Sequence, residues 1–232
     1  MSIILLLETA TSVCSVALSI NGKTVAIKEE DANNIHASKL TLFIKEVLTT
    51  SNVDFADLDA IAVSMGPGSY TGLRIGVSTA KGLCFALDKP LIAINTLKAM
   101  ASGYISENPS FDGLVCPMID ARRMEVFTAI YDQNLNEVEE TYAKIIDEHS
   151  FSELLSNHQT VFIGNGAEKS IAIIKHHNAA SFLGNVNSAS NLSILAQEAF
   201  TRQQFEDVAY FEPFYLKDFV VTTPKRGMEN KR

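Results

Sequence analysis

The sequence has few cysteines, no tryptophan and no long run of apolar residues. Its three cysteines, Cys14, Cys84 and Cys116, are widely spaced and include no C-x-x-C pair, and each lies in an apolar segment. We therefore expect buried, reduced thiols. No run approaches the roughly 18 apolar residues of a membrane span. The short apolar run 3–7 lacks the basic segment that precedes a signal peptide. These features predict a cytoplasmic protein with no membrane segment.

Basic charge is also in short supply. The 232 residues carry 19 Lys and Arg against 27 Asp and Glu, for a net charge of −8. A protein that binds nucleic acid alone usually has a basic face, so we expect any RNA contact to be made mainly by partners. An apolar content of 47% favours a packed core over disorder.

The common catalytic motifs are missing. The chain has no G-x-x-x-x-G-K-[ST], G-x-G-x-x-G, H-E-x-x-H or G-x-S-x-G sequence. Its five histidines are scattered, and no pair stands four residues apart on one helix. We expect these histidines to lie at the surface or to cap helices.

Apolar periodicity predicts a mixed α/β chain built from two similar halves. The first half has expected strands at 3–7, 12–20, 23–29, 58–64 and 91–94, and helices at 36–49, 71–87 and 96–105. After an expected linker at 106–112, the second has strands at 114–119, 124–131 and 161–163, a loop at 164–166, and helices at 150–156 and 190–202. We predict domains at 1–105 and 106–224, and a polar tail at 225–232. The alternative is that two unrelated hairpins look alike.

Each half starts with a strand that ends in an acid, Glu8 or Asp120. In a duplicated fold these acids would face each other across a cleft between the halves, where ligands of such sheets bind. Together they could hold Mg²⁺ through water. The alternative is that each acid caps its own turn, and no third carboxylate is evident nearby.

The most informative stretch runs from Ser64 to Leu83. A strand enters the loop Gly66-Pro67-Gly68, and a helix opens behind Ser69. Such a loop can present backbone N–H groups to a phosphate or nucleotide. It lacks the lysine of a P-loop, and glycines also occupy tight turns for conformational reasons alone.

Small residues recur every four positions on the helix that follows: Gly72, Gly76, Ala80 and Cys84. A stripe of this kind lets another backbone approach closely. It packs either on this chain's own sheet or on a helix of another chain. The helix at 36–49 has an apolar face that could complete such an interface.

Four segments together resemble a known family: ETATSVCSVALS, SMGPGSYTGLRIGVSTAKGL, PLIAINTLKAMA and IDARRMEVFTAIY. They are similar to the TsaB (YeaZ) family, glycoprotease-like proteins that serve as dimerisation subunits in bacterial tRNA threonylcarbamoyladenosine (t6A) biosynthesis. The resemblance extends from Ile3 to about Leu216. It implies the duplicated ribonuclease-H-like fold of actin, Hsp70 and sugar kinases.

The resemblance also implies that this subunit is not the catalyst and needs no cofactor. The related catalytic subunit, TsaD, has an H-x-x-x-H metal pair, and alignment of the glycine–proline blocks places that pair on Thr96 and Met100. Neither side chain replaces an imidazole at a metal site. Glu8 also stands where many relatives have Asp.

In the family, the helices at 36–49 and 71–87 pack against their counterparts in TsaD, or against a second copy as a homodimer when TsaD is absent. The expected interface residues are His36, Leu40, Phe43, Ile44, Val47, Gly72, Leu73, Gly76, Val77 and Ala80. The ATPase TsaE is a further expected partner. The implied reaction modifies N6 of adenosine 37 in tRNAs that read codons beginning with A. The alternatives are a metal-dependent transferase or peptidase and an ATPase of the same fold.

Overall fold

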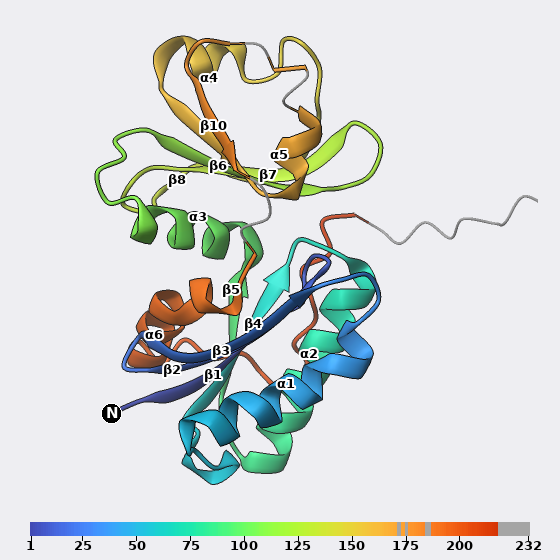
Figure 1. Cartoon of the computed structure of the whole chain (residues 1–232), viewed down its shortest axis with the longest axis vertical. Helices are drawn as coiled ribbons and strands as arrows, with labels where there is room; N and C mark the ends of the chain where they lie inside the picture. The colour runs from blue at the N-terminus through green and yellow to red at the C-terminus, as the bar shows by residue number, and fades with distance from the viewer. Residues whose placement is uncertain (171–172, 175, 184–186, 218–232) are drawn as a thin grey trace, which may run out of the picture.

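The computed structural model describes residues 1–170, 173–174, 176–183 and 187–217, so the predicted tail at 225–232 lies outside the described residues. Two halves lie one above the other in Figure 1, each built on a five-stranded mixed sheet. No helix in the described part of the chain is long and apolar enough to cross a membrane.

The first sheet has the order β3-β2-β1-β4-β5. The antiparallel strands β1 to β3 form a meander, while β4 and β5 run parallel to β1. The Asn21-Gly22 turn has φ values of 50° and 78°, which fits the predicted two-residue hairpin. The strands are β1 (Ile3–Glu8), β2 (Val13–Ile20), β3 (Lys23–Asp31), β4 (Ala60–Gly66) and β5 (Leu91–Asn95).

The second sheet has the order β8-β7-β6-β9-β10, which repeats the order of the first sheet strand by strand. Its pairs are also alike: β8-β7 and β7-β6 are antiparallel, and β6-β9 and β9-β10 are parallel. Its strands are β6 (Leu114–Asp120), β7 (Glu125–Tyr131), β8 (Glu137–Ile145), β9 (Thr160–Ile163) and β10 (Ala179–Leu183). Two sheets with one strand order and one set of directions confirm the predicted duplication. Glu8 and Asp120 end equivalent strands, as expected.

Helices cover both faces of the first sheet. α1 (His36–Ser51) and α2 (Tyr70–Leu87) pack on one face, where their apolar sides join Leu5, Leu7 and Val63 in one buried cluster. The short helix η1 (Phe55–Asp57) precedes β4. The opposite face is covered by η2 (Ala189–Leu192) and α6 (Ser193–Thr201), which come from the end of the chain.

The packing therefore departs from the predicted division at 105/106. Segment 187–217 follows the second half in sequence but lies on the first half, and Glu206 pairs with Leu91 of β5. In the other direction, α3 (Thr96–Glu107) packs under the second sheet through Leu97, Met100 and Ala101. Figure 1 shows α3 between the two halves. Each half thus completes its core with a segment from the other side of the predicted boundary.

The second sheet is covered on its far face by α4 (Ser152–Asn157) and α5 (Asn165–Ser170). β8, β10 and α5 were not predicted from the sequence. The loop expected at 164–166 is wrong, because α5 begins at Asn165. Gly166 lies within this helix. The position is glycine because a Cβ there would lie 2.9 Å from the Ile119 backbone. The glycine signals close packing on β6 rather than a turn.

The three thiols are buried and unpaired, as predicted. Burial raises the pKa of Cys14 to about 11 and those of Cys84 and Cys116 to about 12. Since the thiolate is the reactive form, all three are chemically inert near neutral pH.

We predict that the returning segment is essential to the first half. Leu192→Ala removes a fully buried side chain facing the first sheet and should lower the free energy of unfolding by about 2–5 kcal/mol. The matched control is Ile194→Ala, where the side chain is 47% exposed and the expected change is about 0.5 kcal/mol. Urea denaturation measures both, and equal effects would contradict the packing described above.

Candidate functional site

Glu8 lies at the end of β1, and its side chain is 1% exposed. Burial raises the pKa of its carboxyl group from 4.5 to about 7, and the Ala10 N–H, which donates to Oε1 at 2.6 Å, only partly opposes this effect. The carboxyl group therefore turns back onto its own strand end. It fits the predicted turn-capping role better than that of a solvent-facing metal ligand.

Asp120 occupies the equivalent place on β6 but is used differently. Its carboxylate accepts from Lys169 Nζ at 2.5 Å and from the Arg122 N–H at 2.8 Å. Asn165 Oδ1 accepts from the Asp120 backbone N–H at 2.9 Å. Within the described ranges, no three His, Cys, Asp or Glu side chains are grouped to hold a metal ion. The two acids are topologically equivalent, but each is committed to local contacts, which argues against the predicted Mg²⁺ pair.

The Gly66-Pro67-Gly68 loop is packed from both sides by this chain. A Cβ on Gly66 would lie 2.5 Å from the Phe214 carbonyl oxygen, and one on Gly68 would lie 2.4 Å from that of Ala10. Gly66 also has φ +117°, which favours glycine. These constraints explain both glycines without a ligand.

Backbone N–H groups on both sides of Pro67 are also bonded within the chain. The Gly66 N–H donates to Thr96 Oγ1 at 3.2 Å and the Ser69 N–H donates to Ala10 O at 2.7 Å, while Pro67 has no N–H. Ser69 caps α2 by accepting from the Gly72 N–H at 3.3 Å. A phosphate cradle needs a row of available N–H groups. Here the Gly66 and Ser69 N–H groups are bonded within the chain and Pro67 has none, which argues against the predicted phosphate or nucleotide loop.

The small-residue stripe of α2 faces the chain's own sheet. A Cβ on Gly72 would lie 2.1 Å from the carbonyl oxygen of Thr9, and one on Gly76 would lie 2.2 Å from Thr9 Oγ1. Thr9 Oγ1 also donates to the Gly72 carbonyl at 2.9 Å. Of the two readings of the stripe, the contacts favour close packing of α2 on the end of β1.

The residues predicted for the partner interface are accordingly placed in the interior, which corrects that assignment. All are buried because they form the inner faces of α1 and α2: His36, Leu40, Phe43, Ile44, Val47, Gly72, Leu73, Gly76, Val77 and Ala80. His36 is neither exposed nor a cap, since its Nε2 lies 3.2 Å from Val13 O. Buried side chains have no surface to offer a partner.

The outer face of the same helix pair has a different set of side chains. Leu42 on α1 is 59% exposed and Phe85 on α2 is 86% exposed. Gly82, inside α2, is exposed, and a Cβ built on it meets no atom within 4 Å. Sequence reasoning missed this face because it followed the small-residue stripe. The signal was Gly82 itself, a mid-helix glycine off the stripe.

Thr96 and Met100, the two positions that the family resemblance placed at a metal pair, are both buried. Thr96 Oγ1 accepts the Gly66 N–H, and Met100 packs with Val115 and Ile119 under the second sheet. Both positions therefore serve the junction between the two halves.

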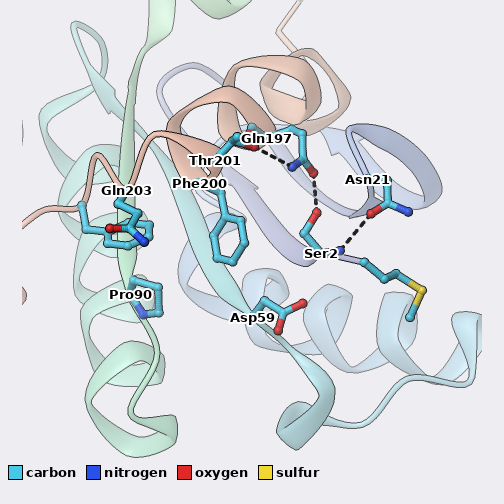
Figure 2. Close-up of a pocket in the computed structure, with 10 residues that line it drawn as sticks. Ser2, Asn21, Asp59, Pro90, Gln197, Phe200, Thr201 and Gln203 are labelled. Carbon is cyan, nitrogen blue, oxygen red and sulfur yellow. Dashed lines mark hydrogen bonds between the residues drawn. The ribbon is translucent and has the colours of Figure 1, made fainter.

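A cavity of about 580 Å³ lies at the amino ends of β1, β4 and β5, whereas Glu8 lies at the carboxyl end of β1. It is lined by residues that precede β1, β4 and β5, among them Ser2, Asp59 and Pro90, and by Gln197 and Phe200 of α6 (Figure 2). Figure 2 shows Gln197 hydrogen-bonded to Ser2, so α6 is tied to the start of the chain. Ligands of open α/β sheets bind at the carboxyl ends of the strands, which this cavity does not adjoin.

The duplicated halves define the class of protein. The fold is the one shared by actin, Hsp70 and sugar kinases, and it is also found in the solved activator of 2-hydroxyisocaproyl-CoA dehydratase from Clostridium difficile. That chain superposes with a TM-score of 0.54 at 10% identity, over 87% of this chain and 97% of that one. At this identity, the likeness shows the fold alone.

The family follows from nearer relatives. The model of "TsaD: tRNA N6-adenosine threonylcarbamoyltransferase" matches residues 23–225. The chain is 33% identical to the tRNA threonylcarbamoyladenosine biosynthesis protein TsaB of Escherichia coli (strain K12), over 97% of this chain and 99% of that protein. The solved YeaZ from Pseudomonas aeruginosa superposes with a TM-score of 0.81 at 27% identity, over 93% of this chain and all of that one (100%). The chain belongs to the TsaB (YeaZ) family.

We predict opposite effects of alanine at two glycines of α2. Gly72→Ala places a Cβ against the Thr9 carbonyl and should lower the free energy of unfolding by about 1–3 kcal/mol. Gly82→Ala meets open space and should raise it by about 0.5–1 kcal/mol, because alanine is the better helix former. Thermal and urea denaturation measure both. Equal stability of the two variants would contradict the inward orientation of the stripe.

We also predict a stability change with pH that depends on Glu8. Because the folded carboxyl group has a pKa of about 7 and the ordinary value is 4.5, the folded state keeps a proton that the unfolded chain releases. The free energy of unfolding therefore falls by about 3 kcal/mol in total as the pH rises from 4.5 to about 7, and it is level at higher pH. Urea denaturation from about pH 5 to about pH 8 should show this loss in the native chain and not in Glu8→Gln. Parallel pH profiles would refute it.

Proposed function

We propose that this chain is a non-catalytic scaffold subunit of t6A biosynthesis. It would bind and organise a TsaD-like catalytic subunit, together with a TsaE-like ATPase, for N6-threonylcarbamoylation of adenosine 37 in tRNAs that read codons beginning with A. The family membership supports the pathway, since the E. coli relative is named as a threonylcarbamoyladenosine biosynthesis protein. The match to the TsaD family model supports a partner of similar fold, because related halves can pair through equivalent surfaces.

The outer face of α1 and α2 carries this proposal. α1 and α2 lie side by side on the first sheet (Figure 1), and Leu42 and Phe85 project from them into solvent. A glycine inside an exposed helix costs about 1 kcal/mol relative to alanine, and nothing within the described chain explains Gly82. A partner helix that crosses α2 at this point would explain it, since glycine permits the closest approach of two backbones.

The chemistry of the remaining polar residues supports a non-catalytic role. Glu8 is buried, Asp120 is paired with Lys169, and the N–H groups of Gly66 and Ser69 donate within the chain. Without a TsaD-like chain, the same outer face would join two copies into a homodimer.

The test is a bulky side chain at the proposed crossing. Gly82→Leu should weaken binding to the TsaD-like subunit at least tenfold, because the helices are forced apart and lose their packing contacts. The monomer should stay folded, since leucine favours helices and the position is open. Isothermal titration calorimetry measures the affinity, and sedimentation velocity measures homodimerisation.

The matched control is Ser156→Leu, an exposed small residue on α4 of the second half. It should leave both associations unchanged. Native affinity of Gly82→Leu would show that partners bind elsewhere. Stoichiometric iron or zinc in the purified chain, or stabilisation by ATP with Mg²⁺, would instead favour the metal-dependent or ATPase alternative.

A further inference from the structure

The turn between β6 and β7 has an unusual backbone. Arg122 and Arg123 have φ values of 68° and 51°, so two consecutive non-glycine residues adopt the left-handed conformation. Turns of this shape favour Asn and Gly, which reach positive φ with less strain than other residues. Both arginines are exposed. Strained backbone of this kind clusters at functional sites.

Lys169 holds this turn in place with three hydrogen bonds. Its Nζ donates to Asp120 Oδ1 at 2.5 Å and to the Arg123 carbonyl at 2.8 Å, and it also donates to the Glu125 carbonyl. The Glu125 carboxylate is in turn paired with Lys217. The two acids that flank the turn are therefore neutralised by lysines. Across the described ranges, neither Arg122 nor Arg123 has an ion pair, so their charges face solvent.

Lys217 connects this turn to an aromatic group on the first half. It ends a strap, residues 211–217, that is fixed by the Phe214 N–H donating to Met65 O at 2.8 Å. Two residues before Lys217, the ring of Tyr215 lies 4.8 Å from that of Tyr70. Figure 1 shows the strap rising beside the N-terminal end of α2 toward the second half.

A further cation lies over this ring pair. Arg74 is 5.4 Å from the centre of the Tyr70 ring and donates to its hydroxyl at 2.8 Å. Tyr215 keeps 36% of its surface exposed, and Glu212 is the nearby acid. The Lys217–Glu125 ion pair joins this ring group to the strand that follows the arginine turn. We call the two groups together, Tyr70, Arg74 and Tyr215 with Arg122 and Arg123, the arginine–tyrosine surface.

We propose that the arginine–tyrosine surface binds single-stranded RNA, with a base on the Tyr215 ring and phosphates at Arg122 and Arg123. Exposed aromatic rings beside arginines are how proteins hold unpaired bases and their backbone. The net charge of −8 predicted that RNA is left to partners, but binding depends on the local charge where the strand lies. The inference rests on the proposed function, because a tRNA loop is the single-stranded RNA that this pathway supplies.

Fluorescence anisotropy with the full chain and a labelled RNA stem–loop tests the proposal. Arg122→Gln with Arg123→Gln should weaken binding about tenfold or more and reduce the salt slope of log K by roughly 1.4, for two lost phosphate contacts on a single strand. Tyr215→Ala should weaken binding by roughly tenfold and Tyr215→Phe should restore it, since stacking needs only the ring. A blunt duplex RNA without a loop should bind more weakly than the stem–loop.

The charge-matched control is Lys23→Gln with Arg202→Gln, two exposed cations of the first half. Equal loss in this control would reduce the effect to net charge and overturn the proposal. Full displacement of the RNA by ATP would assign the surface to free nucleotides and also overturn it. The arginine turn lies on the second half, away from Gly82, so binding to the TsaD-like subunit should survive its substitution. Loss of RNA binding and loss of partner binding are thus separately observable.

Discussion

The close approach of the turn after β1 to the start of α2 is the contact on which the first half depends. The Thr9 carbonyl oxygen lies only 2.1 Å from where a Cβ of Gly72 would be, and the Ala10 carbonyl accepts a hydrogen bond from the Ser69 N–H at the start of α2. Any side chain larger than hydrogen at Gly72 would push α2 off the sheet. This contact fixes the distance between α2 and the first sheet. The positions of the glycine–proline loop, of the strap (residues 211–217) beside it and of the outer face of α2 depend on that distance. The glycines that look like a ligand loop are therefore first a packing device.

The two halves share one strand order but differ at the ends of their strands and on their surfaces. Each half ends its first strand with an acid, yet Glu8 is buried and holds its proton up to about pH 7, while Asp120 is half exposed and paired with Lys169. The first half adds two helices whose outer sides have unpartnered apolar residues, and the second adds a strained arginine turn. The halves are also interlocked, because α3 and segment 187–217 each complete the core of the opposite half. The proposed partner surface and the proposed RNA surface therefore lie on two halves that share their core segments.

Much of the fold could be predicted from the sequence, because strong periodicity marks β1, α1, β4 and α2, and Asn21-Gly22 marks the hairpin. β8 was missed because its exposed, glutamate-rich sequence lacks an apolar pattern. α5 was missed because Gly166 reads as a loop residue, and only the backbone of β6 shows why it is glycine. The return of α6 to the first sheet is a long-range contact that no local pattern encodes.

The site could be predicted less well, because sequence spacing gives the apolar side of a helix but not what that side faces. Gly72 and Gly76 have the pattern of a helix–helix contact, and the atom that fills the gap belongs to Thr9 of the same chain. Leu42, Gly82 and Phe85 stood out only once the inner face was assigned. Likewise, the positive φ values of Arg122 and Arg123 are invisible in a sequence that reads simply as a polar turn.

Hydroxyl-radical footprinting of the chain, alone and with its TsaD-like partner, is the decisive measurement. If the outer face of α1 and α2 is the scaffold surface, the exposed side chains of Phe85 and Leu42 should be strongly protected in the complex, while Val25 on β3 and Ile145 on β8 should react as before. Unchanged reactivity of Phe85 and Leu42 in a formed complex would show that the partner binds another face and that this assignment is wrong.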